Sequence, residues 1–399
     1  LWDICKEHAD IFRLPGDRLT EIKGVSHTID TPSLTSQNFI NVRQYRIPES
    51  YKTEIDEQVR NMLEQDIIKP STSPFNFPLI VVPKKVDASG KKKWRVCIDY
   101  RKLNELTIGD SFPIPNIQDI LDQLGRARYF SALDCASGYW QICIREVDKC
   151  KTAFSTREGH FEFNRMPFGL KTAPQTYHRL MNYALAGLLG IYCFVYLDDV
   201  IIHAENIEEH NRKLIVIFEQ FRKHNIQLEP DKGEFLKTEL QYLGHLVTRE
   251  GVKPDPRKVE AIQNFPTPKN TRDVKSFLGL ASYYRKFIRN FSHIANPLTQ
   301  LLKKDKVWEW TEKCELSFSE LKSLLSNEPL LQYPDFEKEF IVTTDASDYA
   351  IGSILSQGPL GEDRPIAYAS RMLNEAERNY STFEKEFLAI IWACKHYRP

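Results

Sequence analysis

Apolar and polar residues follow two different spacings along this chain. Apolar side chains that recur every three to four positions predict helices, and they do so over 50–68, 116–124, 172–185 and 208–224. Shorter runs of β-branched and aromatic residues predict strands. These runs cover 79–82, 94–98, 129–133, 191–197, 200–203 and 241–247. The mixture predicts an α+β fold.

The pattern changes after Gly251. Four prolines lie within 252–270, and a strongly periodic helix is then expected from about Thr271. Its apolar stripe is Val274, Phe277, Leu278, Ala281, Tyr284, Ile288 and Phe291. Its other face carries Arg272, Lys275, Gly279, Ser282, Lys286 and Arg289. Small residues between basic ones would let a phosphate backbone approach closely, and a plain surface helix is the alternative. Strands at 340–344 and 350–356 and a helix at 384–396 are expected to follow.

Length and composition exclude several classes of protein. A chain of 399 residues exceeds the size of one hydrophobic core, so we expect at least two domains. With 42% hydrophobic residues it is neither disordered nor collagen-like. Eight cysteines without CxxC or zinc spacing indicate structural thiols in a reducing compartment. The uncharged run 180–197 contains two glycines and leads into two aspartates, so we expect buried core there and no membrane span. Because the chain starts at Leu1, we expect a fragment of a longer precursor.

Charge is balanced overall but unevenly distributed. Lys plus Arg and Asp plus Glu both number 54, so no global basic field marks a nucleic-acid-binding protein. Residues 84–104 carry a net charge of +6 and residues 250–306 a net charge of +7, whereas residues 307–399 carry −7. Two basic zones suit a cleft that holds a polyanion, although two solvated surfaces would have the same composition.

The adjacent acids Asp198 and Asp199 are the first candidate for chemistry. They lie in FVYLDDVII, between two runs that would pair as strands. Such a pair is either a hairpin turn in solvent or a pair directed at a cation. A tight type I′ turn favours Asn-Gly or Asp-Gly, which this is not, so metal binding gains support.

A third carboxylate ends a second predicted strand. Asp134 follows Tyr129 in the run YFSALD, before a turn at Ser137 and Gly138. If the two strands are neighbours, three carboxylates converge at one end of a sheet, and their repulsion requires cations. Oxygen ligands without His or Cys favour Mg²⁺. Two such ions about 4 Å apart serve in-line phosphoryl transfer.

Several motifs together resemble a known family, the reverse transcriptase of gypsy-type LTR retrotransposons, which is related to retroviral enzymes. The motifs are YLDDV (196–200), LDCASGYWQI (133–142), MPFGLKTAPQTY (166–177), KKWRVCIDYRKLN (92–104) and YLGH (242–245). TDAS (344–347) and NYSTFEKEFLAIIWA (379–393) resemble the RNase H domain that follows in these Pol polyproteins. The resemblance covers about residues 45–399.

The resemblance implies a right-hand polymerase with an antiparallel-sheet palm, followed by a truncated RNase H-like α/β domain. The expected parts are an N-terminal arm or linker at 1–45, fingers at 46–125, a palm at 126–248 with a fingers insertion at about 144–165, a thumb and connection at 249–332, and the truncated domain at 333–399.

The resemblance also assigns roles at the polymerase site. Asp134, Asp198 and Asp199 would bind two Mg²⁺ ions, with Mn²⁺ as the alternative metal, and Lys232 would protonate the leaving pyrophosphate. The nucleotide-binding residues would be Lys84 or Lys85, Arg95, Cys135 through its carbonyl, Tyr139, Phe168 and Gly169. Tyr139 would exclude a 2′-hydroxyl by its bulk; without the resemblance, it would be taken as a core tyrosine.

Other residues are implied in holding nucleic acid. Leu243, Gly244 and His245 would form the turn that steadies the primer end, while Gly279 and Tyr283 would follow the minor groove of the template–primer, beside the basic residues Lys275 and Lys286. In the C-terminal part, Asp345 and Glu386 match two RNase H metal ligands. The remaining carboxylates are expected beyond Pro399, so we predict no useful RNase H activity.

The function implied is RNA-directed DNA polymerisation at a primer 3′ end. Its partners would be an RNA or DNA template, a primer, deoxynucleoside triphosphates, and the protease and integrase of the same polyprotein. The expected location is the cytoplasm, within virus-like particles. Two alternatives remain: a domesticated, inactive element protein that binds nucleic acid, and an RNA-synthesising polymerase.

Overall fold

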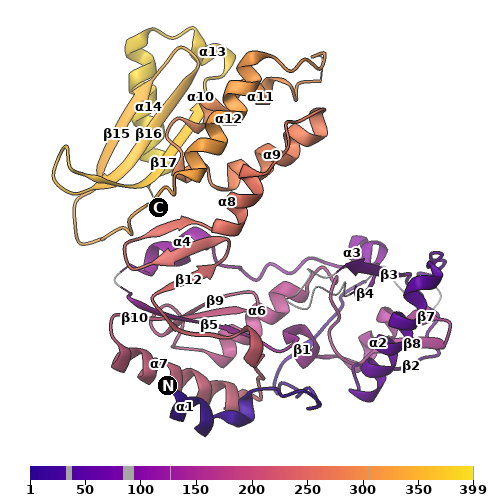
Figure 1. Ribbon diagram of the computed structural model, residues 1–399. Helices are drawn as coiled ribbons and strands as arrows, with labels where there is room; N and C mark the ends of the chain where they lie inside the picture. The colour runs from indigo at the N-terminus through magenta and orange to yellow at the C-terminus, as the bar shows by residue number, and fades with distance from the viewer. Residues whose placement is uncertain (33–37, 84–93, 126, 305, 399) are drawn as a thin grey trace. The chain divides into compact units, whose positions relative to one another are not determined.

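The computed structural model describes residues 1–32, 38–83, 94–125, 127–304 and 306–398. The chain divides into two compact units. The first unit contains 1–116, 131–203 and 207–236, and the second contains 117–130, 204–206 and 237–399. Each unit is described below by itself, and many of its elements are labelled in Figure 1.

A four-stranded sheet forms the centre of the first unit. Its order is β11-β5-β10-β9. The strands are β5 (Tyr129–Asp134), β9 (Cys193–Tyr196), β10 (Asp199–Ala204) and β11 (Glu234–Lys237). The predicted hairpin is confirmed, because β9 and β10 are antiparallel and Tyr196 pairs with Asp199. Leu197 and Asp198 therefore form the connecting turn.

Two helices cover this sheet with apolar side chains. They are α6 (Ala173–Ala184) and α7 (Ile207–His224), both close to their predicted bounds, and α7 lies along the sheet in Figure 1. Their inward residues are fully buried in one core with the strands, as amphipathic helix spacing requires. These residues include Leu180, Leu214, Ile217, Phe218 and Phe221.

A second part of the first unit contains α2 (Lys52–Glu64) and two small sheets. One sheet pairs β3 (Leu79–Pro83) with β4 (Trp94–Ile98), as predicted. The other has the order β2-β8-β7, with β2 (Ile68–Pro70), β7 (Phe154–Thr156) and β8 (Gly159–Phe163). The helix predicted over 50–68 ends earlier, because residues 68–70 pair with β8 as a strand.

Residues 1–32 place several apolar side chains in the core of this unit. Ile11, Ile22 and Ile29 are buried in its core, although the segment is expected from the sequence to be an arm or linker. After α1 (Trp2–Glu7), Asp10 accepts a 2.5 Å hydrogen bond from Arg222 of α7. The weak periodicity does not reveal this burial, because the three buried isoleucines lie singly in the sequence, outside α1 and the short strand at 26–27.

The second unit begins with a three-stranded sheet of order β12-β13-β14. These strands are β12 (Glu239–Tyr242), β13 (His245–Thr248) and β14 (Val252–Pro254). The prediction of one strand over 241–247 is wrong. Leu243 and Gly244 have φ values of 47° and 74°, so the chain reverses there and forms a hairpin.

The long helix expected from Thr271 is also shorter than predicted. It ends at Tyr283 as α9 (Thr271–Tyr283), and a 3₁₀ turn and α10 (Phe291–Ile294) follow. Asn290 has a φ of 55°, which no continuing helix contains. The predicted apolar stripe is nevertheless largely buried, because the short segments fold back on the same core. Its buried members are Val274, Phe277, Ala281, Tyr284, Ile288 and Phe291.

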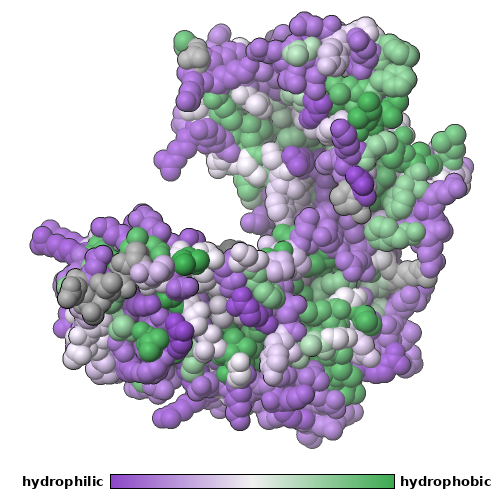
Figure 2. Space-filling model, turned by 180° about the vertical axis from the view of Figure 1, so that it is seen from behind, coloured by the Kyte–Doolittle hydropathy of each residue, from purple (hydrophilic) through white to green (hydrophobic). Residues whose placement is uncertain are grey.

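The C-terminal part of the second unit is a three-stranded antiparallel sheet covered by one long helix. The strands are β15 (Ile341–Ala346), β16 (Ala350–Gln357) and β17 (Arg364–Met372), and α14 (Thr382–His396) packs on them through Ala389. The opposite face of α14 exposes apolar side chains, and Figure 2 shows apolar patches on the surface of this unit. The exposed residues are Phe383, Phe387, Ile390 and Ile391.

The remaining helices and strands complete the two units. They are β1 (Ser26–His27), α3 (Arg101–Leu106), α4 (Ile117–Gln123), β6 (Cys143–Ile144), α5 (Glu146–Lys149), α8 (Pro256–Gln263), α11 (Asn296–Gln300), α12 (Glu312–Ser326) and α13 (Glu375–Arg378). All eight cysteines carry free thiols. None of the helices in the described parts of the chain is long and apolar enough to cross a membrane.

Candidate active site

Three aspartates from two neighbouring strands lie close together in the first unit. Asp134 is the last residue of β5, Asp199 is the first residue of β10, and Asp198 lies in the turn before it. Burial, followed by the negative charges of Asp198 and Asp134, raises the pKa of Asp199 to about 6. The three carboxylates are therefore near enough to repel one another.

The chemistry of this cluster fits divalent cations. Its donors are carboxylate oxygens, which hard ions such as Mg²⁺ prefer, and a bound cation would relieve the repulsion that raises the pKa of Asp199. Within the described ranges, no three His, Cys, Asp or Glu side chains are already arranged around one common point. The fit therefore rests on donor type and electrostatics.

Lys232 supplies a positive charge at the same place. It ends a 3₁₀ turn (Pro230–Lys232), and its Nζ lies 3.0 Å from Oδ1 of Asp134. The Lys232 charge also opposes the rise in the pKa of Asp199. Its side chain is 60% exposed, so the ammonium group is accessible to solvent and to a ligand.

A cluster of aromatic rings and one guanidinium group contains three of the predicted nucleotide-binding residues, Arg95, Tyr139 and Phe168. The ring centroids of Tyr139 and Phe168 are 5.2 Å apart, and the guanidinium carbon of Arg95 lies 5.2 Å from the Phe168 centroid. Gly169 has a φ of 93°, and its carbonyl accepts a 2.8 Å hydrogen bond from Asn104. Lys84 and Lys85 lie outside the described residues.

Tyr177 and Gly138 belong to this site but were not singled out from the sequence. Tyr177 is fully buried in α6, and its ring centroid lies 5.4 Å from that of Tyr139. A Cβ atom at Gly138 would lie 2.7 Å from Tyr177 Oη, so glycine is required there. Burial raises the pKa of the adjacent Cys135 thiol to about 12, so the thiol is protonated at pH 7. Tyr177 and Gly138 lie in two different motifs, and the spacing of residues in the sequence does not reveal that the fold brings these motifs together.

The second unit contains the residues implied in holding primer and template. Leu243 and Gly244 form the turn between β12 and β13, and His245 follows it. Burial lowers the pKa of His245 to about 4, so its imidazole is neutral at pH 7. On α9, Lys275 and Gly279 are exposed, and no atom would contact a Cβ at Gly279.

Tyr283 and Lys286 each form a hydrogen bond within the second unit. The Tyr283 hydroxyl donates a 2.7 Å hydrogen bond to the carbonyl of Leu243. Lys286 Nζ donates a 2.6 Å hydrogen bond to Oε1 of Gln118 in α4, and burial lowers its pKa to about 8. Lys286 is thus directed toward α4, although the helical pattern placed it on one outer face with Lys275.

Asp345 and Glu386 lie on neighbouring elements of the second unit. Asp345 is exposed in β15, and Glu386 is partly exposed on α14, which packs against that strand. A pocket of about 140 Å³ lies beside Asp345 and is also lined by Asn290, His293 and Ser370.

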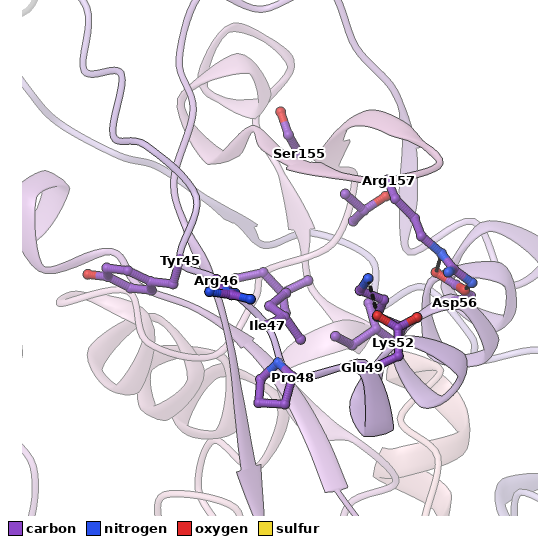
Figure 3. A pocket seen from close by; sticks show the side chains of 12 residues that line it. Tyr45, Arg46, Ile47, Pro48, Glu49, Lys52, Asp56, Ser155 and Arg157 are labelled. Carbon is purple, nitrogen blue, oxygen red and sulfur yellow. Dashed lines mark hydrogen bonds and ion pairs between the residues drawn. The ribbon is translucent and has the colours of Figure 1, made fainter.

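A larger pocket of about 460 Å³ lies in the first unit (Figure 3). Its charged side chains largely pair with one another. Lys52 lies 2.5 Å from Glu49, and Arg157 binds the buried Asp56. Its lining includes none of the predicted catalytic or nucleotide-binding residues, and we assign it no function.

Comparisons with known proteins show which families this chain resembles. Residues 82–247 match the family model "Reverse transcriptase (RNA-dependent DNA polymerase)", and residues 310–399 match "RNase H-like domain found in reverse transcriptase". The chain is 48% identical over 385 residues to the retrovirus-related Pol polyprotein from transposon 297 of Drosophila melanogaster, covering 96% of this chain and 36% of that protein. It is 44% identical over 352 residues to the Pol polyprotein from transposon gypsy of the same organism, covering 85% of this chain and 34% of that protein. The chain spans about a third of the length of these relatives.

Solved structures show the same fold. The foamy viral protease–reverse transcriptase in complex with double-stranded DNA matches with a TM-score of 0.89 and 26% identity, covering 99% of this chain and 68% of that chain. The same viral protein in complex with an RNA/DNA hybrid matches with a TM-score of 0.85 and 25% identity, covering 99% of this chain and 52% of that chain. The expected α+β polymerase fold with an RNase H-like domain is therefore confirmed.

Proposed function

Because this chain carries the reverse transcriptase domain and the RNase H-like domain of gypsy-type retrotransposon Pol polyproteins, we propose that it copies an RNA or DNA template into DNA. The observation that carries the proposal is the cluster of Asp134, Asp198 and Asp199 at one end of a sheet, beside Lys232. A nucleic-acid-binding protein without catalysis would need no such cluster, so the inactive alternative is not favoured.

Each residue of the cluster has a proposed task in adding a deoxynucleotide. Asp134, Asp198 and Asp199 would hold two divalent ions, with Mg²⁺ or Mn²⁺ as the metal. When bound, these ions would activate the primer 3′-hydroxyl and neutralise the leaving pyrophosphate. Lys232, which is already paired with Asp134, would donate a proton to the pyrophosphate.

The aromatic cluster beside the aspartates suits selection of deoxynucleotides. Tyr139 packs on Phe168 and Tyr177, so its ring has little room to move aside for a 2′-hydroxyl. Arg95 lies over the Phe168 ring and would contact the triphosphate with its guanidinium group. Gly169 and the Cys135 carbonyl would complete this pocket, together with Lys84 or Lys85.

The remaining expectations are part of the same proposal. Fingers, palm, thumb and connection would occupy residues 46–332, and the primer and template would contact 243–245 and the exposed face of α9. The foamy viral relative is described in complexes with double-stranded DNA and with an RNA/DNA hybrid, which supports such partners. We also propose that the other domains of a Pol polyprotein are partners of this chain. Its proposed location is the cytoplasm, within virus-like particles.

For the RNase H-like domain we propose that this chain lacks useful hydrolytic activity. The resemblance assigns two metal ligands to this domain, Asp345 and Glu386, and these are fewer carboxylates than a two-metal hydrolytic site needs. Degradation of an RNA–DNA hybrid by this chain, lost on Asp345→Asn, would contradict the proposal.

Gel-resolved primer extension on an RNA template tests the polymerase proposal. We expect Mg²⁺-dependent extension by the wild type and none by Asp198→Asn, with the template–primer Kd changed by less than about threefold because the aspartates bind metal. Asp231→Asn is the control. It removes one negative charge from the exposed residue that precedes Lys232 and should retain activity. Equal losses of binding and synthesis in Asp198→Asn would contradict the role of a metal ligand.

A further inference from the structure

Two successive tyrosines fix both central residues of the turn between β12 and β13. The Tyr283 hydroxyl donates to the Leu243 carbonyl at 2.7 Å, and the Tyr284 hydroxyl donates to the Gly244 carbonyl at 2.6 Å. Both distances are typical of good O–H···O hydrogen bonds. The Gly244 carbonyl also accepts from the backbone N–H of Asp255 at 3.3 Å. The last residue of α9 and the residue after it therefore hold the turn by its backbone.

The turn needs such support because its backbone is strained. Tyr242 pairs with His245, so Leu243 and Gly244 form a two-residue hairpin loop, and both have positive φ. A type I′ loop of this kind favours Asn-Gly, whereas a leucine with a φ of 47° is unfavourable because of its Cβ. Strained residues of this sort persist where their surroundings determine their conformation.

Side-chain packing joins the same two segments. The His245 ring lies 5.4 Å from the Tyr283 ring and 5.8 Å from the Tyr284 ring, measured between centroids. A Cβ atom on Gly244 would lie 3.2 Å from the Tyr283 ring, so the turn and the tyrosine are in close contact. Because no gap separates them, a displacement of the end of α9 would displace the turn.

We infer that Tyr283 and Tyr284 are positioning residues for the primer 3′ end. Their hydroxyls fix the turn 243–244 to α9, so that primer contacts made by the turn stay in register with contacts made by Lys275 and Gly279 on the exposed face of the helix. The inference rests on the proposed function. It gives Tyr283 a task different from following the minor groove, because its hydroxyl is used within the protein.

Tyr283→Phe and Tyr284→Phe test the inference, because each keeps the ring and removes only the hydroxyl. We expect a fall of about 3- to 10-fold in the single-turnover rate of incorporation for each variant, and at least about 10-fold for the double variant, since small misplacements of reacting groups have large effects on rate. The template–primer Kd should change by less than about twofold. The fluorescence of 2-aminopurine at the primer 3′ end should change in the bound complex.

Tyr333→Phe is the matched control. The Tyr333 hydroxyl donates a 2.9 Å hydrogen bond to the carbonyl of Thr248, at the other end of β13. This variant loses the same kind of bond from the same hairpin, so its melting temperature should fall as much as that of the test variants, while rate and fluorescence stay at wild-type values.

Three outcomes distinguish the possibilities. A slower rate with retained affinity, in the tyrosine variants but not in the control, supports positioning. The inference is overturned if Tyr283→Phe and Tyr284→Phe incorporate nucleotides as fast as Tyr333→Phe. It is also overturned if their loss of rate follows an equal loss of affinity for template–primer. If the wild type itself extends no primer while binding template–primer normally, the proposed function fails, and that result is separate from the comparison between variants.

Discussion

The ammonium group of Lys232 lies 3.0 Å from Oδ1 of Asp134, so one member of the carboxylate cluster is already paired with a cation from the same chain. The two residues are 98 positions apart and meet because β5 ends beside the 3₁₀ turn at 230–232. In the proposed function, Lys232 would therefore affect both the proposed metal ligand Asp134 and the protonation of the leaving pyrophosphate.

Replacing Lys232 by alanine should separate these two effects. We expect Lys232→Ala to lower the incorporation rate by about 100-fold, the lower end for a lost general acid. The Mg²⁺ concentration for half-maximal rate should fall or stay the same, because a competing cation leaves Asp134. Lys237→Ala, which removes an exposed lysine of β11, is the control and should match the wild type. A raised Mg²⁺ requirement in Lys232→Ala would contradict this account.

Tyr139 should determine the choice of sugar by its bulk. Tyr139→Ala is expected to raise the use of ribonucleotides relative to deoxynucleotides by at least about tenfold, because the removed ring no longer clashes with a 2′-hydroxyl. Tyr139→Phe keeps the ring that packs on Phe168 and should keep the selectivity. Competition between the two nucleotide types in primer extension measures the ratio. Equal selectivity in the alanine and phenylalanine variants would show that bulk is not the cause.

Stability should depend on pH through His27. Its ring is fully buried, Nδ1 lies 2.9 Å from Oγ1 of Thr176, and burial lowers its pKa to about 4. In the unfolded chain its pKa is about 6.5, so between pH 6.5 and 4 only the unfolded state binds the proton. The free energy of unfolding of the first unit should therefore fall with falling pH, by at most about 1.4 kcal/mol per pH unit from this group.

Denaturant unfolding of the wild type and of His27→Gln at several pH values measures this dependence. The variant should be less stable at pH 8 but should show a shallower decline below pH 6.5. Between pH 8 and 9 the two slopes should agree, because His27 is almost entirely neutral in both states there. Identical slopes below pH 6.5 would exclude His27 as a source of the acid sensitivity.

The parts of the fold that local patterns determine could be predicted from the sequence. The helices α6 and α7 and the β9–β10 hairpin follow from periodicity, and their bounds agree within a few residues. Periodicity failed where the backbone leaves its regular path at single residues. Leu243 has a positive φ and divides a predicted strand into two. Asn290 also has a positive φ and lies after the end of α9, within the range that was predicted as one helix.

The candidate site shows the same limit. Motifs indicated Asp134, Asp198 and Tyr139, but the direction of a side chain depends on tertiary contacts. Lys286 has helical spacing with Lys275 in the sequence, yet it turns toward Gln118 once the helix has ended. Tyr177 is the last residue of the motif at 166–177, and Gly138 belongs to the motif at 133–142. Only the fold brings the Tyr177 ring against Gly138.

In the proposed function, Asp134, Asp198 and Asp199 together hold a pair of divalent ions. Binding of Mn²⁺, followed by electron paramagnetic resonance in the presence of template–primer and a non-hydrolysable deoxynucleotide, tests it most directly and needs no catalysis. The account predicts two tightly bound ions per chain in the wild type, and weaker binding of at least one of them, by at least about tenfold, in Asp134→Asn. The same stoichiometry and affinity in both proteins would contradict the claim.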